Sequence, residues 1–169
     1  AWRDPYVIQF PDTGEFHAYI TARVNYGPHD GRGVIAHAKS SDLLTWEILP
    51  PVTEPGDFGH MEVPQMVRIG NFYYLLFCNG SGNHSALRRQ RLKTSPQTGT
   101  HYYISESPLG PFRSLTDEYF AADNDGSLYS GKLIQGPDGQ WCFMAFKNRD
   151  EQGNFVGEIV DPIPVKQHS

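Results

Sequence analysis

The sequence predicts an all-β protein made of four-stranded antiparallel sheets that repeat like the blades of a β-propeller. Three observations lead to this prediction. Almost no segment has helical periodicity, and 17 glycines and 13 prolines supply many tight turns, while 13% of the residues are aromatic. A similar order of strands and turns occurs three times at a spacing of roughly 60 residues, which is the signature of propeller blades. A plain β-sandwich is the structural alternative.

The first repeat, residues 1–55, predicts strands over 6–10, 16–22 and 33–40, and a last one near 46–49. The turn Pro11-Asp12-Thr13-Gly14 joins the first two strands, and a long loop over 25–31 precedes the third. The second repeat, residues 59–120, predicts strands over 65–69, 72–78 and 101–105 and a last one near 112–115. We expect its basic run over 88–93 to be a solvated loop.

The third repeat, residues 126–169, predicts strands over 128–135, 140–146 and 155–159, the first two joined by a Gly-Pro-Asp-Gly turn. We therefore expect a single propeller-like domain over residues 1–169, with three blades. Cys78 and Cys142 each lie in an apolar strand pattern, so free thiols are expected, although the sequence leaves a disulfide open.

Composition excludes two classes of partner. The net charge of −5 argues against a nucleic-acid-binding surface, which is usually basic, and no apolar run is long enough to span a membrane. The histidines show no metal-ligand spacing, so we expect neither a metal nor another cofactor. The compartment, cytoplasmic or secreted, stays open.

Two carboxylates stand at the entrances of successive repeats. Asp4 directly precedes Pro5, and Glu62 lies two residues before Pro64, 58 positions after Asp4. A proline is tolerated at the first residue of a strand because no ladder donor is lost there. Acids at such positions can simply cap strand starts. Two carboxylates at one end of neighbouring sheets, however, are also what glycosidic-bond cleavage requires.

Four motifs resemble those of five-bladed propeller glycosidases. Arg3-Asp4-Pro5 resembles the Arg-Asp-Pro motif of the invertase, inulinase and levansucrase families. Residues 60–64 (HMEVP), followed by residues 70–75 (GNFYYL), resemble the blade that carries the general acid of these families. Residues 41–47 (SDLLTWE) and 106–112 (ESPLGPF) resemble two corners of the same superfamily. The motifs occur in the expected order, and the resemblance covers nearly the whole chain.

The resemblance implies roles for individual residues. Asp4 would contact sugar hydroxyls and stabilise an oxocarbenium-like transition state, with Arg3 as its neighbour. Glu62 would be the general acid/base. Its neighbours Met61 and Val63 are apolar, so we expect partial desolvation of the carboxyl group, as suits a proton donor.

Further candidates for contact with a carbohydrate substrate lie at or beside the blade entrances. Aromatic residues there can stack on sugar rings, although most aromatics of a propeller fill its core. These candidates are Trp2, His60, Tyr129 and Lys132.

The sequence departs from the family pattern in one respect. The nucleophilic aspartate of these families lies in a blade before Arg-Asp-Pro, and no such motif is found here, while three blades are too few to close a ring of five. We therefore consider a fragment of a larger enzyme, or an assembly with another copy or partner that supplies blades. A carbohydrate-binding module without catalysis is the alternative from another class. Within the superfamily, Asp4 could instead be the general base of an inverting enzyme like arabinanases or xylosidases.

Overall fold

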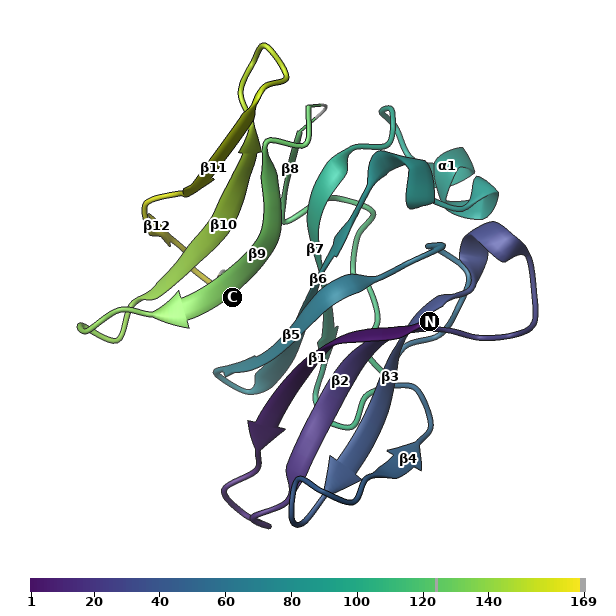
Figure 1. Cartoon of the computed structure of the whole chain (residues 1–169), viewed down its shortest axis with the longest axis vertical. Coiled ribbons are helices and arrows are strands. Elements are labelled where there is room, and N and C mark those ends of the chain that lie inside the picture. The colour runs from purple at the N-terminus through teal and green to yellow at the C-terminus, as the bar shows by residue number, and fades with distance from the viewer. Residues whose placement is uncertain (124, 168–169) are drawn as a thin grey trace.

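The computed structural model describes residues 1–123 and 125–167, and almost all of its regular structure is β-strand (Figure 1). The strands form three antiparallel sheets of four. The first sheet follows chain order: β1 (Trp2–Gln9), β2 (Phe16–Arg23), β3 (Gly33–Ser40) and β4 (Glu47–Leu49). The second sheet does the same: β5 (Glu62–Ile69), β6 (Phe72–Asn79), β7 (Thr98–Ser105) and β8 (Ala121–Asp123). The predicted fold class is confirmed.

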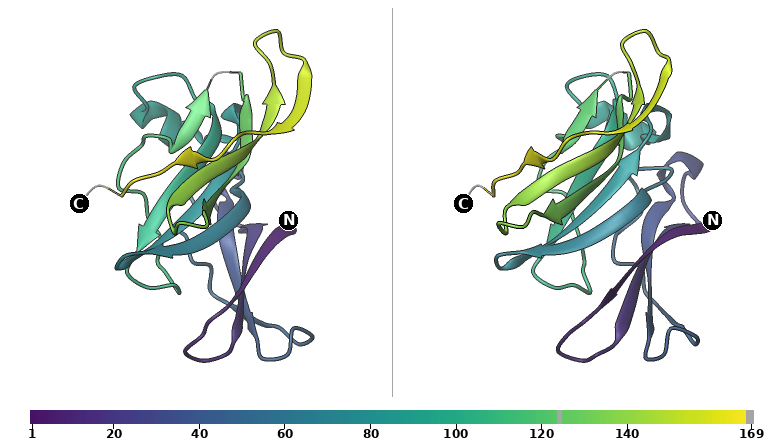
Figure 2. Two further views of the ribbon diagram at one scale, coloured as in Figure 1. Left: turned by 90° about the vertical axis from the view of Figure 1, so that its left-hand side faces the viewer. Right: turned by 60° about the vertical axis from the view of Figure 1, so that its left-hand side comes forward.

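In the third sheet, the central strand β10 (Trp141–Arg149) pairs on one side with β9 (Leu128–Gln135). On its other side it pairs with β11 (Phe155–Ile159) and β12 (Ile163–Pro164), which lie along different parts of β10. The first strands of the three sheets lie side by side, because β5 contacts both β1 and β9 (Figures 1 and 2). The three sheets are arranged in chain order, with the second between the first and the third.

Four element predictions need correction. The strands β1 and β5 begin at Trp2 and Glu62, four and three residues earlier than expected, because both continue through an irregular segment that was taken for a turn. The last strand of the second sheet is β8 instead of a segment near 112–115, where only isolated bridges form. The basic run is not a solvated loop, since α1 (Ala86–Arg91) forms there.

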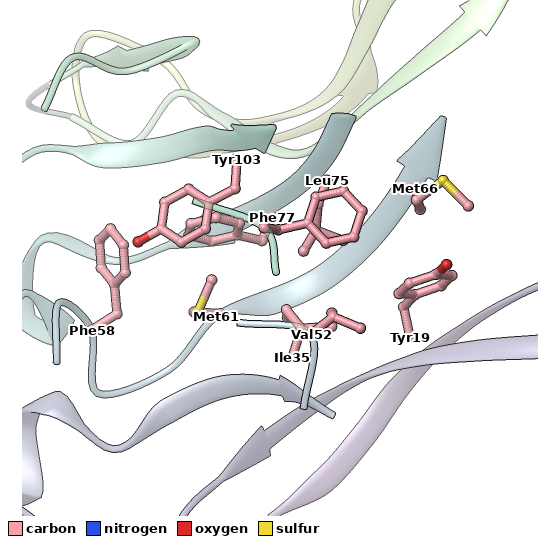
Figure 3. Packing of buried hydrophobic residues seen from close by; sticks show 10 residues of the cluster. Tyr19, Ile35, Val52, Phe58, Met61, Met66, Leu75, Phe77 and Tyr103 are labelled. Carbon is pink, nitrogen blue, oxygen red and sulfur yellow. The ribbon is translucent and has the colours of Figure 1, made fainter. Parts of the chain in front are cut away.

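The first and second sheets pack face to face through a cluster of buried apolar side chains (Figure 3). Tyr19 and Ile35 come from the first sheet, and Leu75 and Phe77 come from the second; all four are fully buried. Burial of each such side chain contributes about 1.5–3 kcal/mol. The hydroxyl of Tyr19 also donates to the carbonyl of Pro108 at 2.7 Å, and Pro108 lies within the 106–112 motif.

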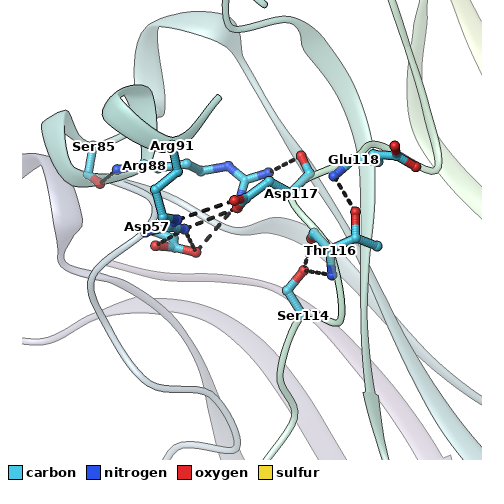
Figure 4. A network of polar contacts seen from close by, with 8 residues as sticks. All are labelled: Asp57, Ser85, Arg88, Arg91, Ser114, Thr116, Asp117 and Glu118. Carbon is cyan, nitrogen blue, oxygen red and sulfur yellow. Dashed lines mark hydrogen bonds and ion pairs between the residues drawn. The ribbon is translucent and has the colours of Figure 1, made fainter. Parts of the chain in front are cut away.

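The helix α1 is held by a buried cation. The side chain of Arg88 is only 1% exposed and donates to Asp117 at 2.8 Å, while its guanidinium lies 4.7 Å from the centre of the Phe58 ring. Arg91 adds ion pairs to Asp57 and Asp117 (Figure 4). These long-range contacts hold the basic run to the segments around Asp57 and Asp117.

Both cysteines are free thiols, Cys78 buried and Cys142 half-buried. No helix in the described part of the chain is long and apolar enough to cross a membrane.

Candidate active site

The first strand of each sheet contains the same β-bulge. Strand pairing slips by one residue over residues 3–6, 62–65 and 129–132. Each bulge has a residue with left-handed backbone: Asp4 (φ 53°), Val63 (φ 45°) and Ser130 (φ 56°). A non-glycine residue in this region costs about 1–2 kcal/mol, and such strain clusters at functional sites. Bulges next to active sites turn a side chain out of the regular alternation.

The bulges define which residues are equivalent between blades. Val63 is the counterpart of Asp4, and Glu62 is the counterpart of Arg3. Asp4 and Glu62 therefore lie at the entrances of successive sheets, as predicted, but at different positions of the bulge. Their spacing to proline differs accordingly, because Glu62 lies one residue further from its proline than Asp4 does.

Arg3, Glu62 and Tyr129 each precede one of the left-handed residues. The side chains of Arg3 and Tyr129 both contact the carboxylate of Glu62. Glu62 Oε1 lies 2.5 Å from Arg3 Nη2, and the Tyr129 hydroxyl donates to Glu62 Oε2. The Glu62 side chain is 24% exposed, so it is partly desolvated and still open to solvent. Burial, followed by the hydrogen bond to Glu62, raises the pKa of Tyr129, which keeps its proton and acts as a donor.

Asp4 lies beside this group. Its Oδ2 atom lies 3.4 Å from Arg3 Nε and accepts hydrogen bonds from Thr21 Oγ1 at 3.2 Å and from the Val63 N–H at 3.5 Å. Arg3 therefore bridges the two carboxylates. Among the described residues none hydrogen-bonds to Asp4 Oδ1, which leaves that oxygen available to a sugar hydroxyl.

Lys132 reaches the same region from the third sheet. Its Nζ donates to the Val63 carbonyl and, at 3.3 Å, to the Pro64 carbonyl, so it stabilises the bulge of β5. Burial lowers the pKa of Lys132, while the Cys78 thiol and Asp4 act in the opposite direction. The predicted contact of Lys132 with substrate remains a prediction, since its ammonium group is here bound to backbone carbonyls.

His60 and Trp2 lie at the edge of the group. The two ring nitrogens of His60 are 3.2 Å from Arg3 Nη2 and 3.3 Å from Arg23 Nη1. Burial first, and then the charges of Arg3 and Arg23, lower the pKa of His60 and favour its neutral form. Trp2 is 54% exposed, so its ring is accessible for stacking.

Sequence reasoning missed Arg23, Thr21 and Gln65. Gln65 joins the second sheet to the third, because its side chain accepts from Leu133 N at 2.8 Å and donates to Leu133 O at 2.9 Å. Strand alternation could have found Thr21 and Arg23, since both lie on β2 two residues apart and Thr21 pairs with Arg3. No sequence signal singles out Gln65.

A cavity of about 900 Å³ lies elsewhere, between the second sheet and the C-terminal segment. Its walls are mostly apolar and include Phe72, Tyr74, Tyr102, Ile104 and Val165. None of the predicted site residues lines it. We assign the site to the cluster of Arg3, Asp4, Glu62 and Tyr129 at the bulges rather than to this cavity, because two carboxylates and their donors from all three sheets meet there. Within the described residues, no group of three or more His, Cys, Asp or Glu side chains could hold a metal ion.

Comparison with solved structures identifies the architecture. Levansucrase from Bacillus subtilis superposes with a TM-score of 0.76 at 13% identity, over 100% of this chain and 48% of that one. Inulosucrase from Halalkalicoccus jeotgali, bound to kestose, gives 0.72 at 19%, over 92% and 41%. A β-fructofuranosidase from Bombyx mori gives 0.64 at 25%, over 96% and 34%. No protein-family model and no curated protein sequence matches the chain.

The likeness is one of fold. The chain has the architecture of part of a five-bladed β-propeller glycoside hydrolase, a group that includes levansucrase, inulosucrase, β-fructofuranosidase and endo-arabinase. It spans less than half the length of each of these structures.

Proposed function

We propose that this chain forms part of a glycoside hydrolase that acts on fructose-containing oligosaccharides. In this proposal Glu62 is the general acid/base and Asp4 stabilises the transition state. The supporting observation is the convergence of Arg3, Glu62 and Tyr129 from three consecutive blades, with Asp4 adjoining through Arg3. Arrangement of a carboxylate by donors on rigid strands is what proton transfer at a glycosidic bond requires.

The chemistry follows from the two carboxyl groups. As the bond between the anomeric carbon and the leaving oxygen breaks, Glu62 transfers its proton to that oxygen. The positive charge that develops on the sugar ring is balanced by the Asp4 carboxylate. Arg3 contacts both acids and holds the two carboxylates at a fixed separation, while the Tyr129 hydroxyl fixes the orientation of Glu62.

The nucleophile that receives the sugar must be a further carboxylate or water. Among residues 1–123 and 125–167, no other Asp or Glu forms an ion pair or hydrogen bond with Arg3, Tyr129 or Lys132. We propose that the missing group comes from a further blade, carried by a longer chain, a second copy or a partner.

The test is fructose release from sucrose and from inulin-type and levan-type oligosaccharides, measured on the longer chain or assembly that contains the further blade. Glu62→Gln should lower kcat/KM at least about 100-fold, the usual contribution of a general acid. Glu15→Gln is the matched control, because Glu15 is a half-exposed acid whose ion pair with Lys39 at 3.4 Å lies outside the cluster. Release that persists unchanged in Glu62→Gln would overturn the assignment.

A carbohydrate-binding role without hydrolysis is the second candidate. The cluster contains two carboxylates, Asp4 and Glu62, whereas the enzymes that the motifs resemble use a third as the nucleophile. This difference favours binding without hydrolysis. Saturable binding of a fructo-oligosaccharide without turnover, lost in Asp4→Asn, would support this candidate over the enzyme.

A further inference from the structure

A chain of polar contacts extends from the two acids to a second arginine. It runs from Asp4 through Arg3 to His60 and then to Arg23. Arg23 is half-buried, and its Nη2 donates to the His29 carbonyl at 2.6 Å, which fixes the guanidinium beside His60. This end of the cluster is therefore built on strand β2 and its following loop.

The hydrogen bonding of His60 is unbalanced. Both ring nitrogens face guanidinium groups, at 3.2 Å and 3.3 Å, and guanidinium groups only donate. A neutral imidazole has one acceptor nitrogen, so one of its two contacts sets an N–H against an N–H. If Nδ1 accepts from Arg3, Nε2–H points toward Arg23 with no acceptor between them.

The charges are unbalanced in the same place. Arg3 is compensated by ion pairs to Asp4 and Glu62. Among the described residues no carboxylate forms an ion pair with Arg23, whose partners are a backbone carbonyl and the imidazole. An uncompensated, half-buried arginine stands out in a chain of net charge −5.

We propose that Arg23 and His60 Nε2 bind an anionic group on the leaving half of the substrate, a phosphate ester or a carboxylate. This inference rests on the proposed function, in which Glu62 protonates the leaving oxygen. Asp4 and Arg23 are the two ends of this series of contacts. Because the proposed function places the fructosyl ring against Asp4, we place the leaving sugar toward Arg23. One oxygen of the anion accepts from Nε2–H and another from the guanidinium, which satisfies both donors.

The first test needs no sugar. Inorganic phosphate is titrated into the chain at constant ionic strength, and the imidazole resonances of His60 are followed by NMR. We expect a saturable shift and a rise in the pKa of His60, whose charged neighbours are Arg3, Arg23, Glu62 and the Ala1 amino group. Arg23→Gln should weaken binding at least about 10-fold.

Arg32→Gln is the matched control. Arg32 is also half-buried and donates to a carbonyl of the same loop, Gly27 O at 2.9 Å, but does not contact His60. Phosphate binding should persist in this variant. A shift that fails to saturate, or one that Arg23→Gln leaves unchanged, overturns the anion site whether or not the chain hydrolyses sugars.

The second test separates the two sources of the anion. Glucuronate replaces phosphate in the same titration, and kcat/KM is compared for a fructoside whose leaving sugar carries a phosphate ester, one whose leaving sugar is a uronate, and sucrose. The fructoside that carries the tighter-binding anion should have the higher kcat/KM. Arg23→Gln should lower the ratio of its kcat/KM to that for sucrose at least about 10-fold. An unchanged preference in Arg23→Gln contradicts the proposal, whereas hydrolysis lost only in Glu62→Gln would leave the proposed function intact.

Discussion

Replacement of Gln65 by leucine removes the two side-chain hydrogen bonds that join the second sheet to the third. These bonds go to the backbone N–H and carbonyl of Leu133, at 2.8 and 2.9 Å. The site is dry, since Gln65 is 7% and Leu133 is 4% exposed. Leucine has nearly the same volume as glutamine, so the variant tests hydrogen bonding with little change in packing.

The expected loss can be worked from these contacts. Each buried backbone group that loses its partner costs about 1–3 kcal/mol, so the two together cost about 2–6 kcal/mol. Leucine buries slightly more apolar surface than glutamine does, and this difference returns about 1 kcal/mol. We therefore expect the free energy of unfolding to fall by about 3 kcal/mol.

Urea unfolding measures this change, with fluorescence of Trp141 on β10 as the probe for the third sheet. Gln9→Leu is the control, because Gln9 is exposed and its side chain makes one hydrogen bond, to Gly14 O at 3.0 Å. We expect the control to change the free energy of unfolding by less than about 0.5 kcal/mol. A Gln65→Leu variant as stable as the control would refute the view that this side chain fastens the two sheets together.

Three further predictions follow from named contacts. Burial lowers the pKa of His37 and of His84 to about 4 from 6.5, so the unfolded state binds more protons between these values. The free energy of unfolding should fall as the pH is lowered from 6.5 to about 4, by up to about 1.4 kcal/mol per pH unit for each histidine; equal urea midpoints at pH 7 and pH 5 would contradict this. Arg88→Met removes a buried guanidinium from the half-exposed carboxylate of Asp117 and should destabilise the chain by about 2 kcal/mol in the same assay, whereas a loss below about 0.5 kcal/mol would make the pair irrelevant to stability. Tyr129→Phe removes a donor to Glu62 and should lower kcat/KM for fructose release about 10- to 100-fold; an unaltered kcat/KM would exclude this hydrogen bond from the reaction.

The repeating architecture could be predicted because its causes are local. Turn residues and alternating apolar residues mark each strand, and the predicted third repeat agrees with β9, β10 and β11 to within a few residues. The bulges could not be predicted in this way. A valine at φ 45° is disfavoured by its own side chain, so only the surrounding sheet holds Val63 there.

The same distinction applies to the site. Arg3, Glu62 and Tyr129 were each predicted as site residues, but their equivalence within three bulges depends on register and appears only in the folded chain. The position of α1 was missed because Arg88 finds its partner Asp117 29 residues away. Arg23 was missed because its neighbour His60 lies just before β5, 37 residues away.

The most direct test of the account is a crystal structure of the Glu62→Gln variant with a bound fructo-oligosaccharide. The account predicts a sugar ring against Asp4, with the leaving oxygen within hydrogen-bonding distance of the side chain at position 62 and of no other side-chain acid. A sugar found only in the apolar cavity between the second sheet and the C-terminal segment would contradict it.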